Sequence, residues 1–225
     1  MTGYGPKQGK NNGGGAKIAM SDAEMMRGEE LPPGLAALVE RAGKSGRGIP
    51  PVEKWHPSFC ADLDIRIASD GRWYYLGSPI GREPLVRLFA SVLRKDGDGR
   101  HYLVTPVEKI GITVEDAPFV AVEMHVGGSG KTQRMTLRTN VGDVVEAGPD
   151  NPLRFALEGG TDGLKPYVLV RGRLEALFSR PLLHQLAEHF EEEDVGGRKM
   201  YGVWSGGTFF PVATVDELAA QGETA

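Results

Sequence analysis

Residues 65–77 read IRIASDGRWYYLG and predict the first element of the fold. Ile65 and Ile67 alternate with polar residues, and the run 73–76 is aromatic and apolar, so both stretches are typical of β-strands. Asp70-Gly71 lies between them, and this pair is typical of a two-residue hairpin turn in which both central residues have positive φ. The stretch therefore predicts a β-hairpin.

A helix is expected next, because apolar residues in the range 82–94 recur at helical spacing. These residues are Leu85, Val86, Leu88, Phe89, Val92 and Leu93. Arg82 would open the helix, where a positive charge is slightly unfavourable against the helix dipole. A further strand is predicted at 102–104. The first unit is thus hairpin, helix and strand, with Trp73 and Phe89 joining hairpin to helix in the core.

The pattern becomes strand-like after residue 117. One strand face is predicted to carry Val120, Val122, Met124 and Val126, and the partner strand carries Met135 and Leu137. Glu123 and Arg138 fall on the opposite faces, where they can pair across the strands. Further strands are predicted at 153–157 and 167–170. A helix follows near 180–192, with residues 191–194 as its solvated acidic end, and then a hairpin at 200–212 around Gly206-Gly207.

The two halves of the chain contain short segments of similar sequence. Arg82-Glu83-Pro84-Leu85 follows the first hairpin, and Arg180-Pro181-Leu182 follows a later strand. We therefore expect an α+β protein of two small tandem domains with related hairpin–helix–strand motifs, the second β-rich. The expected boundaries are a flexible tail at 1–30, a first domain at 31–115 with an N-terminal helix, a second domain at 116–215 and a C-terminal tail at 216–225.

Composition supports this reading and excludes several classes of protein. The 32 glycines and 15 prolines among 225 residues favour short strands with many turns over a helical bundle. A net charge of −4 gives no general attraction to nucleic acid or to anionic lipid. No apolar run is long enough to span a membrane. The single cysteine, Cys60, has no internal partner for a disulfide, which fits a reducing cytoplasm.

Residues 127–132, GGSGKT, resemble a phosphate-binding loop. His125 stands where that motif requires its first glycine, and the residues after Thr132 alternate as a strand instead of opening a helix. The stretch is therefore predicted to be a hairpin tip, and nucleotide binding is not expected.

His56 and Cys60 lie close in sequence to Asp62 and Asp64. Cys60 is flanked by apolar residues, which favours an inward-facing, structural side chain. A metal site is not expected, since Cys60 is the single cysteine and the remaining histidines are scattered along the chain. Contact with a ligand or partner, or a Cys–His nucleophile assisted by a carboxylate, remain alternatives.

A set of polar residues interrupts the apolar pattern, and two interpretations of it stay open. Its members are Asp64, Arg66, Arg82, Arg87, Glu108, Lys109, Glu115 and Asp116. They are either ion pairs that tie the elements together or a binding surface. As exposed sites, Arg66, Arg82 and Asp116 are each expected to change stability by less than about 1 kcal/mol on replacement by alanine.

The chain from Trp55 to Phe119 resembles a bacterial family known as domain-of-unknown-function family 1285. The resemblance rests on Trp55-His56-Pro57, Cys60, residues 65–73, Gly77-Ser78-Pro79-Ile80, residues 85–93, residues 104–109 and residues 114–119. It implies two small α+β domains with repeated motifs and a part in signal transduction. It carries no established activity, so no catalytic residue is transferred.

The sequence thus predicts a cytoplasmic binding or regulatory module with no cofactor and no catalytic residue. Its partner would be a small ligand or a protein bound at a polar surface or interdomain cleft, and not nucleic acid or membrane. The candidate binding residues are His56, Cys60, Arg66, Arg82, Lys109 and Asp116. The alternatives are an enzyme that uses His56 and Cys60 with a nearby carboxylate, and a scaffold that forms homodimers through a strand edge.

Overall fold

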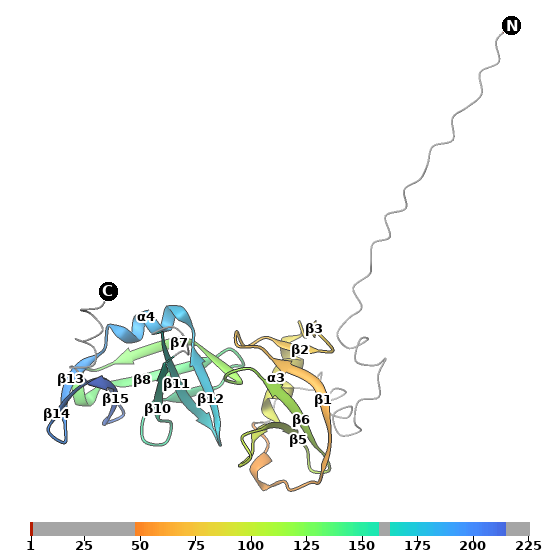
Figure 1. The fold of residues 1–225 in the computed structure, drawn as a ribbon, viewed down its shortest axis with the longest axis horizontal. Coiled ribbons are helices and arrows are strands. Elements are labelled where there is room, and N and C mark those ends of the chain that lie inside the picture. The colour runs from red at the N-terminus through yellow and green to blue at the C-terminus, as the bar shows by residue number, and fades with distance from the viewer. Residues whose placement is uncertain (2–47, 158–162, 215–225) are drawn as a thin grey trace. The chain divides into compact units, whose positions relative to one another are not determined.

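The computed structural model describes Met1, residues 48–157 and residues 163–214 (Figure 1). The predicted tail at 1–30 (apart from Met1), the predicted N-terminal helix of the first domain and the predicted C-terminal tail at 216–225 lie outside the described residues. The described part is mostly β-sheet with two α-helices, arranged as two successive domains.

The first domain is a six-stranded sheet with one helix. Its strands lie in the order β3-β2-β1-β6-β5-β4, and only β1 and β6 run parallel. Phe89 of the helix α3 stacks on Trp73 of β2, with 6.2 Å between the ring centroids, and both side chains are buried, as predicted. The elements are η1 (Val52–Lys54), β1 (Phe59–Ile67), β2 (Trp73–Tyr75), β3 (Ser78–Pro79), α3 (Glu83–Ser91), β4 (Leu93–Lys95), β5 (His101–Val104) and β6 (Lys109–Val114).

The first hairpin is confirmed, but its turn differs from the prediction. Ala68 donates its amide to the carbonyl of Arg72 at 2.9 Å, so three residues, 69–71, form the loop. Gly71 has φ +81°, whereas Asp70 is not among the described residues with positive φ. A three-residue loop needs only one left-handed position, which explains why Asp70 can stay in an ordinary conformation.

The helix α3 is shorter than its apolar pattern predicted. It ends at Ser91, and Leu93 already pairs with Leu103 as part of β4. Val92 and Leu93 are buried, as their apolar character indicates. Helical spacing identified the burial of both residues correctly, but Leu93 belongs to the edge strand β4 and Val92 ends the helix.

The second domain contains two sheets and the helix α4. In the larger sheet the order is β10-β11-β12-β7-β8-β9, with β12 parallel to β7, and β13-β14-β15 form the smaller sheet. The predicted hairpin around Gly206-Gly207 is confirmed. The elements are β7 (Phe119–Gly127), η2 (Gly130–Thr132), β8 (Arg134–Thr139), β9 (Val144–Glu146), β10 (Leu153–Leu157), β11 (Leu164–Arg171), β12 (Leu174–Phe178), α4 (Arg180–Ala187), β13 (Glu191–Val195), β14 (Arg198–Ser205) and β15 (Thr208–Thr214).

The predicted face of β7 is wrong in its first half. Phe119 and Ala121 are the fully buried residues, and Val122 is exposed. The register shifts between Ala121 and Glu123, so one extra residue reverses the alternation at that point. The predicted cross-strand pair is confirmed, because Arg138 donates two hydrogen bonds to Glu123.

The acidic run 191–194 was predicted as a helix end, and this is also wrong. The helix α4 ends at Ala187, and residues 191–195 form β13, paired antiparallel with β14. The pairing is a local hairpin in which Val195 opposes Arg198 across Gly196-Gly197, but the acidic residues of the run are uncommon in strands and concealed it. The acidic side chains therefore lie on the edge strand of the small sheet, where their negative charge disfavours pairing with a further strand.

The two domains contact each other through Asn140 and Arg171 of the second. Asn140 donates its side-chain amide to the carbonyl of Gly71 at 3.3 Å, and a Cβ on Gly71 would lie 2.8 Å from that amide. Arg171 donates to the carbonyl of Ala90 at 2.7 Å, at the end of α3, where helix carbonyls lack intrahelical partners. Glycine at 71 thus permits the close approach of the first hairpin to the second domain.

Candidate functional site

The six predicted site residues do not converge on one place. His56 and Cys60 are exposed around the start of β1, and Arg82 is the residue that precedes α3. The remaining three take part in ion pairs with different partners. Arg66 pairs with Glu115, Lys109 with Asp96 and Asp116 with Lys165.

Cys60 is exposed, so the prediction of an inward-facing side chain is wrong. Phe59 opposes Lys109 and Ala61 opposes Ile110, which leaves Cys60 as the extra residue of a β-bulge. Its thiol lies 3.5 Å from the carbonyl oxygen of Ser58. Within the described residues no hydrogen bond joins His56 to Cys60, so a Cys–His pair is not assembled here.

Lys109 is held in a compact cluster on the first sheet. Its ammonium lies 2.5 Å from a carboxylate oxygen of Asp96 and 3.9 Å from the ring centroid of Tyr102. Arg94 donates to the same carboxylate at 2.6 Å. Burial raises the pKa of Asp96, but the hydrogen bonds from Arg94 and Lys109 outweigh it and hold that pKa below its ordinary value. The cluster is therefore a satisfied ionic network.

Arg66 points away from the buried face of β1, as predicted, and lies over the ring of Tyr74 at 4.3 Å. Glu115 binds its guanidinium and also accepts the amide of Ser69 at 2.9 Å. The hydrogen bond from Ser69 and then that from Arg66 lower the pKa of Glu115. This pair fixes the hairpin to the end of β6.

Asp116 has two partners on β11 of the second domain. Lys165 donates to it at 2.9 Å and the hydroxyl of Tyr167 at 2.8 Å. Burial, together with this hydrogen bond, raises the pKa of Tyr167 to about 12. The phenol therefore stays protonated near neutral pH, and this cluster offers no activated base or nucleophile.

The glycine-rich stretch 127–132 is confirmed as a hairpin tip. It joins β7 to β8 through the short 3-10 helix η2, and a strand follows where a phosphate loop would need an α-helix. The tip nevertheless borders the groove that carries the best candidate site, and sequence reasoning missed this.

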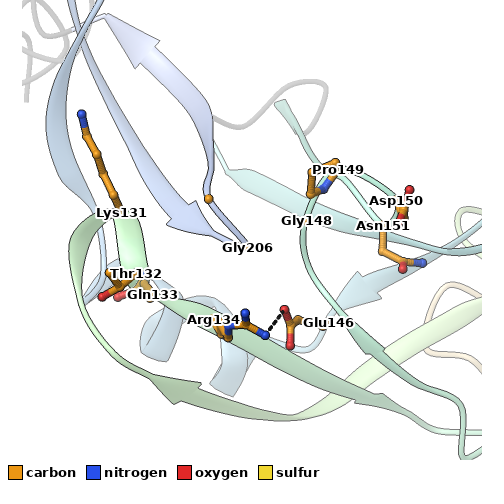
Figure 2. A pocket seen from close by; sticks show the side chains of 11 residues that line it. Lys131, Thr132, Gln133, Arg134, Glu146, Gly148, Pro149, Asp150, Asn151 and Gly206 are labelled. Atoms are coloured by element: carbon orange, nitrogen blue, oxygen red, sulfur yellow. Dashed lines mark hydrogen bonds and ion pairs between the residues drawn. The ribbon is translucent and has the colours of Figure 1, made fainter.

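The groove lies in the second domain and has a volume of about 570 Å³ (Figure 2). Four separate segments line it: the β7–β8 tip, the end of β9, the β9–β10 turn and the β14–β15 turn. The lining residues are Lys131, Thr132, Gln133, Arg134, Glu146, Gly148, Pro149, Asp150, Asn151, Gly206 and Gly207. A volume of this size suits a small organic ligand.

The floor of the groove is fixed by hydrogen bonds. The buried hydroxyl of Ser205 donates to the carbonyl of Ala147 at 2.6 Å and accepts the amide of Met135 at 2.9 Å. Gly206 donates its amide to the carbonyl of Gln133 at 3.0 Å. The turn of the small sheet is thereby locked onto the large sheet, which makes the floor preorganised for binding.

Gly206 is required at this junction. It has φ +56°, and a Cβ there would lie 3.0 Å from the carbonyl oxygen of Ala147 and 3.1 Å from the Cα of Gly148. Neither atom can move without shifting the backbone of the β9–β10 turn. The glycine therefore permits the close contact that shapes the groove.

Charged side chains on the groove are of both signs. Arg134 lies 3.3 Å from Glu146, and this ion pair crosses the groove wall in Figure 2. Lys131 and Asp150 lie on opposite sides of Gly206 in the same view. Asp150 makes no hydrogen bond or ion pair with any residue of the described ranges. No three His, Cys, Asp or Glu side chains of those ranges gather closely enough to hold a metal ion.

Two family models match the chain in succession. One, described as the N-terminal domain of a domain of unknown function (DUF1285), matches residues 50–117. The other, described as the C-terminal domain of a protein of unknown function (DUF1285), matches residues 118–212. The chain belongs to the DUF1285 family. The resemblance stated for residues 55–119 is thus confirmed, and the groove lies within the C-terminal family domain.

One solved structure of a DUF1285 protein agrees with this assignment. A DUF1285 family protein from Silicibacter pomeroyi DSS-3 is 48% identical, covers 81% of this chain and 97% of its own, and superposes with a TM-score of 0.74. A DUF1285 family protein from Shewanella baltica OS155 is 24% identical over 57% of this chain and 94% of its own, with a TM-score of 0.46. The comparison with curated proteins gives no match.

Proposed function

We propose that this DUF1285 protein is a binding module that holds a small polar ligand in the groove of its second domain. The observation that carries the proposal is the groove itself, in which a backbone floor fixed by hydrogen bonds is bordered by charged side chains from separate segments. The six residues expected from the sequence support this function less well, since Arg66, Lys109 and Asp116 already have protein partners.

The proposal keeps the regulatory setting inferred from the sequence. We place the protein in the cytoplasm, because Cys60 has no internal partner and its environment need not be oxidising. None of the helices in the described part of the chain has the length and apolar character to cross a membrane. We further propose that ligand binding gives the protein a part in signalling. The two hairpin–helix–strand units are proposed to be related repeats.

The alternatives are less well supported. An enzyme built on His56 and Cys60 would need the two side chains within reach of each other, and in the described residues the thiol contacts Ser58 instead. A homodimer formed through the open edge of β13 would bring Glu191, Glu192 and Glu193 of two copies together, and like charges oppose this.

The test is binding of small polar molecules, mapped by NMR. A panel of anions, cations, zwitterions and neutral polar molecules is added to ¹⁵N-labelled full-length protein. We expect at least one compound to shift the amide signals of Gly148, Gly206 and Gly207 while leaving those of Gly77 and Gly99 in place. Absence of any such shift, or shifts confined to the first domain, would contradict the proposal.

A matched pair of variants localises the binding. Gly206→Ala and Gly196→Ala both place a methyl group at similar positive φ, +56° and +63°, in hairpin turns. Only the first methyl group meets the groove floor, because nothing lies within 4 Å of the second. We expect Gly206→Ala to weaken binding at least tenfold and Gly196→Ala to retain it. Equal affinities of the two variants would place the ligand elsewhere.

A further inference from the structure

The charges on the groove narrow the class of its ligand, and this step rests on the function proposed above. Of the four charged side chains that line the groove, Arg134 and Glu146 neutralise each other across 3.3 Å. One cation, Lys131, and one anion, Asp150, are left. A polyphosphate or another multiply charged anion would meet two carboxylates here, so the lining does not favour one.

Lys131 is held only loosely by its own protein. Its ammonium lies 4.0 Å from the carboxylate of Glu193 and 5.2 Å from the ring centroid of Trp204, and 71% of the side chain is exposed. An ion pair at that distance and exposure contributes little. The ammonium can therefore turn to a ligand carboxylate, and Trp204 lies close enough to report the event by its fluorescence.

Asp150 provides the opposite charge. It follows Pro149 in the exposed β9–β10 turn, and it has no hydrogen-bond or ion-pair partner among residues 48–157 and 163–214. Its neighbour Asn151 is tied down, because the Asn151 amide donates to the carbonyls of Leu169 and Val170 at 2.9 and 3.1 Å. The turn is thus fixed while the carboxylate is left available.

We infer that the groove binds a small zwitterion, with the ligand's carboxylate at Lys131 and its amine at Asp150. A short peptide with free ends, or an amino acid of similar reach, has this chemistry. The polar backbone of Gly148 and Gly206, which lies between the two charges in Figure 2, suits the amide groups of such a chain.

Triglycine and its two capped forms test the inference directly. N-acetyl-triglycine keeps only the carboxylate, and triglycinamide keeps only the amine, so each cap removes one predicted ion pair. Affinities are measured by Trp204 fluorescence and by the groove amide shifts, with diglycine and tetraglycine as a length series. We expect each cap to weaken binding about three- to fivefold, the size of a part-exposed ion pair.

Variants assign each end of the ligand. In Lys131→Met, triglycinamide should bind as well as triglycine, while N-acetyl-triglycine should still bind more weakly. In Asp150→Asn, N-acetyl-triglycine should bind as well as triglycine, while triglycinamide should still bind more weakly. The control for Lys131 is Lys199→Met, because Lys199 is also 4.0 Å from a β13 glutamate and 74% exposed. The control for Asp150 is Asp64→Asn, an exposed carboxylate of the first domain. In both control variants, each of the two capped peptides should still bind more weakly than triglycine.

The outcomes separate this inference from the proposed function. If the capped and uncapped peptides bind the groove equally, the zwitterion assignment is wrong although the groove binds ligands. The assignment is also wrong if both caps still weaken binding in the Lys131 and Asp150 variants. The same holds if no peptide shifts the groove amides while another compound of the panel does. If neither peptides nor panel compounds bind, the proposed function fails as well.

Discussion

Glu115 and Asp116 are adjacent in sequence and bind different domains. Glu115 holds Arg66 and the amide of Ser69 in the first domain, while Asp116 accepts hydrogen bonds from Lys165 and Tyr167 in the second. Both residues lie in the bend that follows β6, and their two carboxylates therefore fasten the end of this strand to both sides. The connection between the domains is thereby anchored on each side by charge.

The two carboxylates should differ in their contribution to stability. The Asp116 side chain is only 16% exposed and the Glu115 side chain 39%. We expect Asp116→Ala to cost about 1.5–3 kcal/mol, because it leaves Lys165 and the buried Tyr167 hydroxyl without their acceptor. Glu115→Ala should cost clearly less, because solvent screens its exposed ion pair with Arg66. This revises the sequence-based expectation for Asp116.

Urea unfolding of both variants, followed by circular dichroism, measures the difference. Asp116→Asn serves as the control, since it keeps one acceptor for Tyr167 and should recover part of the loss. Equal costs for the Glu115 and Asp116 variants would show that burial at the domain junction does not matter.

Acid stability should depend on His101. This side chain is buried in β5 and its Nε2 has no hydrogen-bond partner in the described part of the chain. Burial, with a smaller contribution from Lys95, lowers the pKa of His101 to about 4. Between pH 6.5 and about 4, His101 is protonated in the unfolded chain but stays neutral in the folded protein. The free energy of unfolding therefore falls as the pH falls through this window.

The expected loss is on the order of 3 kcal/mol, the free-energy equivalent of that pKa difference. His101→Leu should flatten the pH dependence of the unfolding free energy between pH 4 and 6.5. His125→Leu, which changes an exposed histidine of β7, should leave it unaltered. An unchanged slope in His101→Leu would assign the acid sensitivity to other groups.

The stacked pair in the first core gives a further prediction. Trp73 and Phe89 are 1% and 0% exposed, so truncation of either to alanine should cost about 3–5 kcal/mol. The indole nitrogen of Trp73 is buried without a partner in the described residues. Trp73→Phe should therefore cost much less than Trp73→Ala, because it also removes an unsatisfied donor. Thermal and urea denaturation measure both, and a cost below about 1 kcal/mol for either alanine variant would argue against the stack as a core contact.

Two glycines should respond differently to alanine. A Cβ on Gly202 would collide with the carbonyl oxygen of Phe210 and lie 2.9 Å from the Cα of Pro211, both backbone atoms. We expect Gly202→Ala to cost about 3 kcal/mol, since β14 and β15 must separate.

A Cβ on Gly111 would collide only with side-chain atoms, those of Asp62 and Arg100, which pair with each other. Both partners are half exposed, so they can move aside. Gly111→Ala should cost less than about 1 kcal/mol. Comparison of the two unfolding midpoints is the measurement, and a large loss in Gly111→Ala would mean that the surface pair is rigidly held.

Much of the secondary structure was predictable because its causes are local. Alternation predicted the hairpin tip at 127–132, and the strand after Thr132 argued against a phosphate loop. Errors arose where pairing with a neighbouring strand decides the conformation. Leu93 became a strand residue because Leu103 pairs with it, and Glu191 to Asp194 became β13 because β14 lies alongside.

The candidate site was less accessible to sequence reasoning. For Arg66, Lys109 and Asp116 the sequence left two interpretations open, ion pairs between elements or a binding surface. The structure shows ion pairs for all three. The groove was missed because its residues come from four segments that each read as an ordinary turn. Pro149-Asp150 and Gly206-Gly207 indicate turns by composition, but nothing in their spacing places them side by side.

The sequence by itself determined the apolar pattern, the main turns and the family, since these depend on side-chain chemistry and on residues close in the chain. The tertiary structure alone decided which charges are satisfied. Lys109 lies between Asp96 and Tyr102, whereas Asp150 has no partner in the described residues. The physical reason is that an ion pair depends on distance in space, and folding brings together residues whose separation along the chain carries no such information.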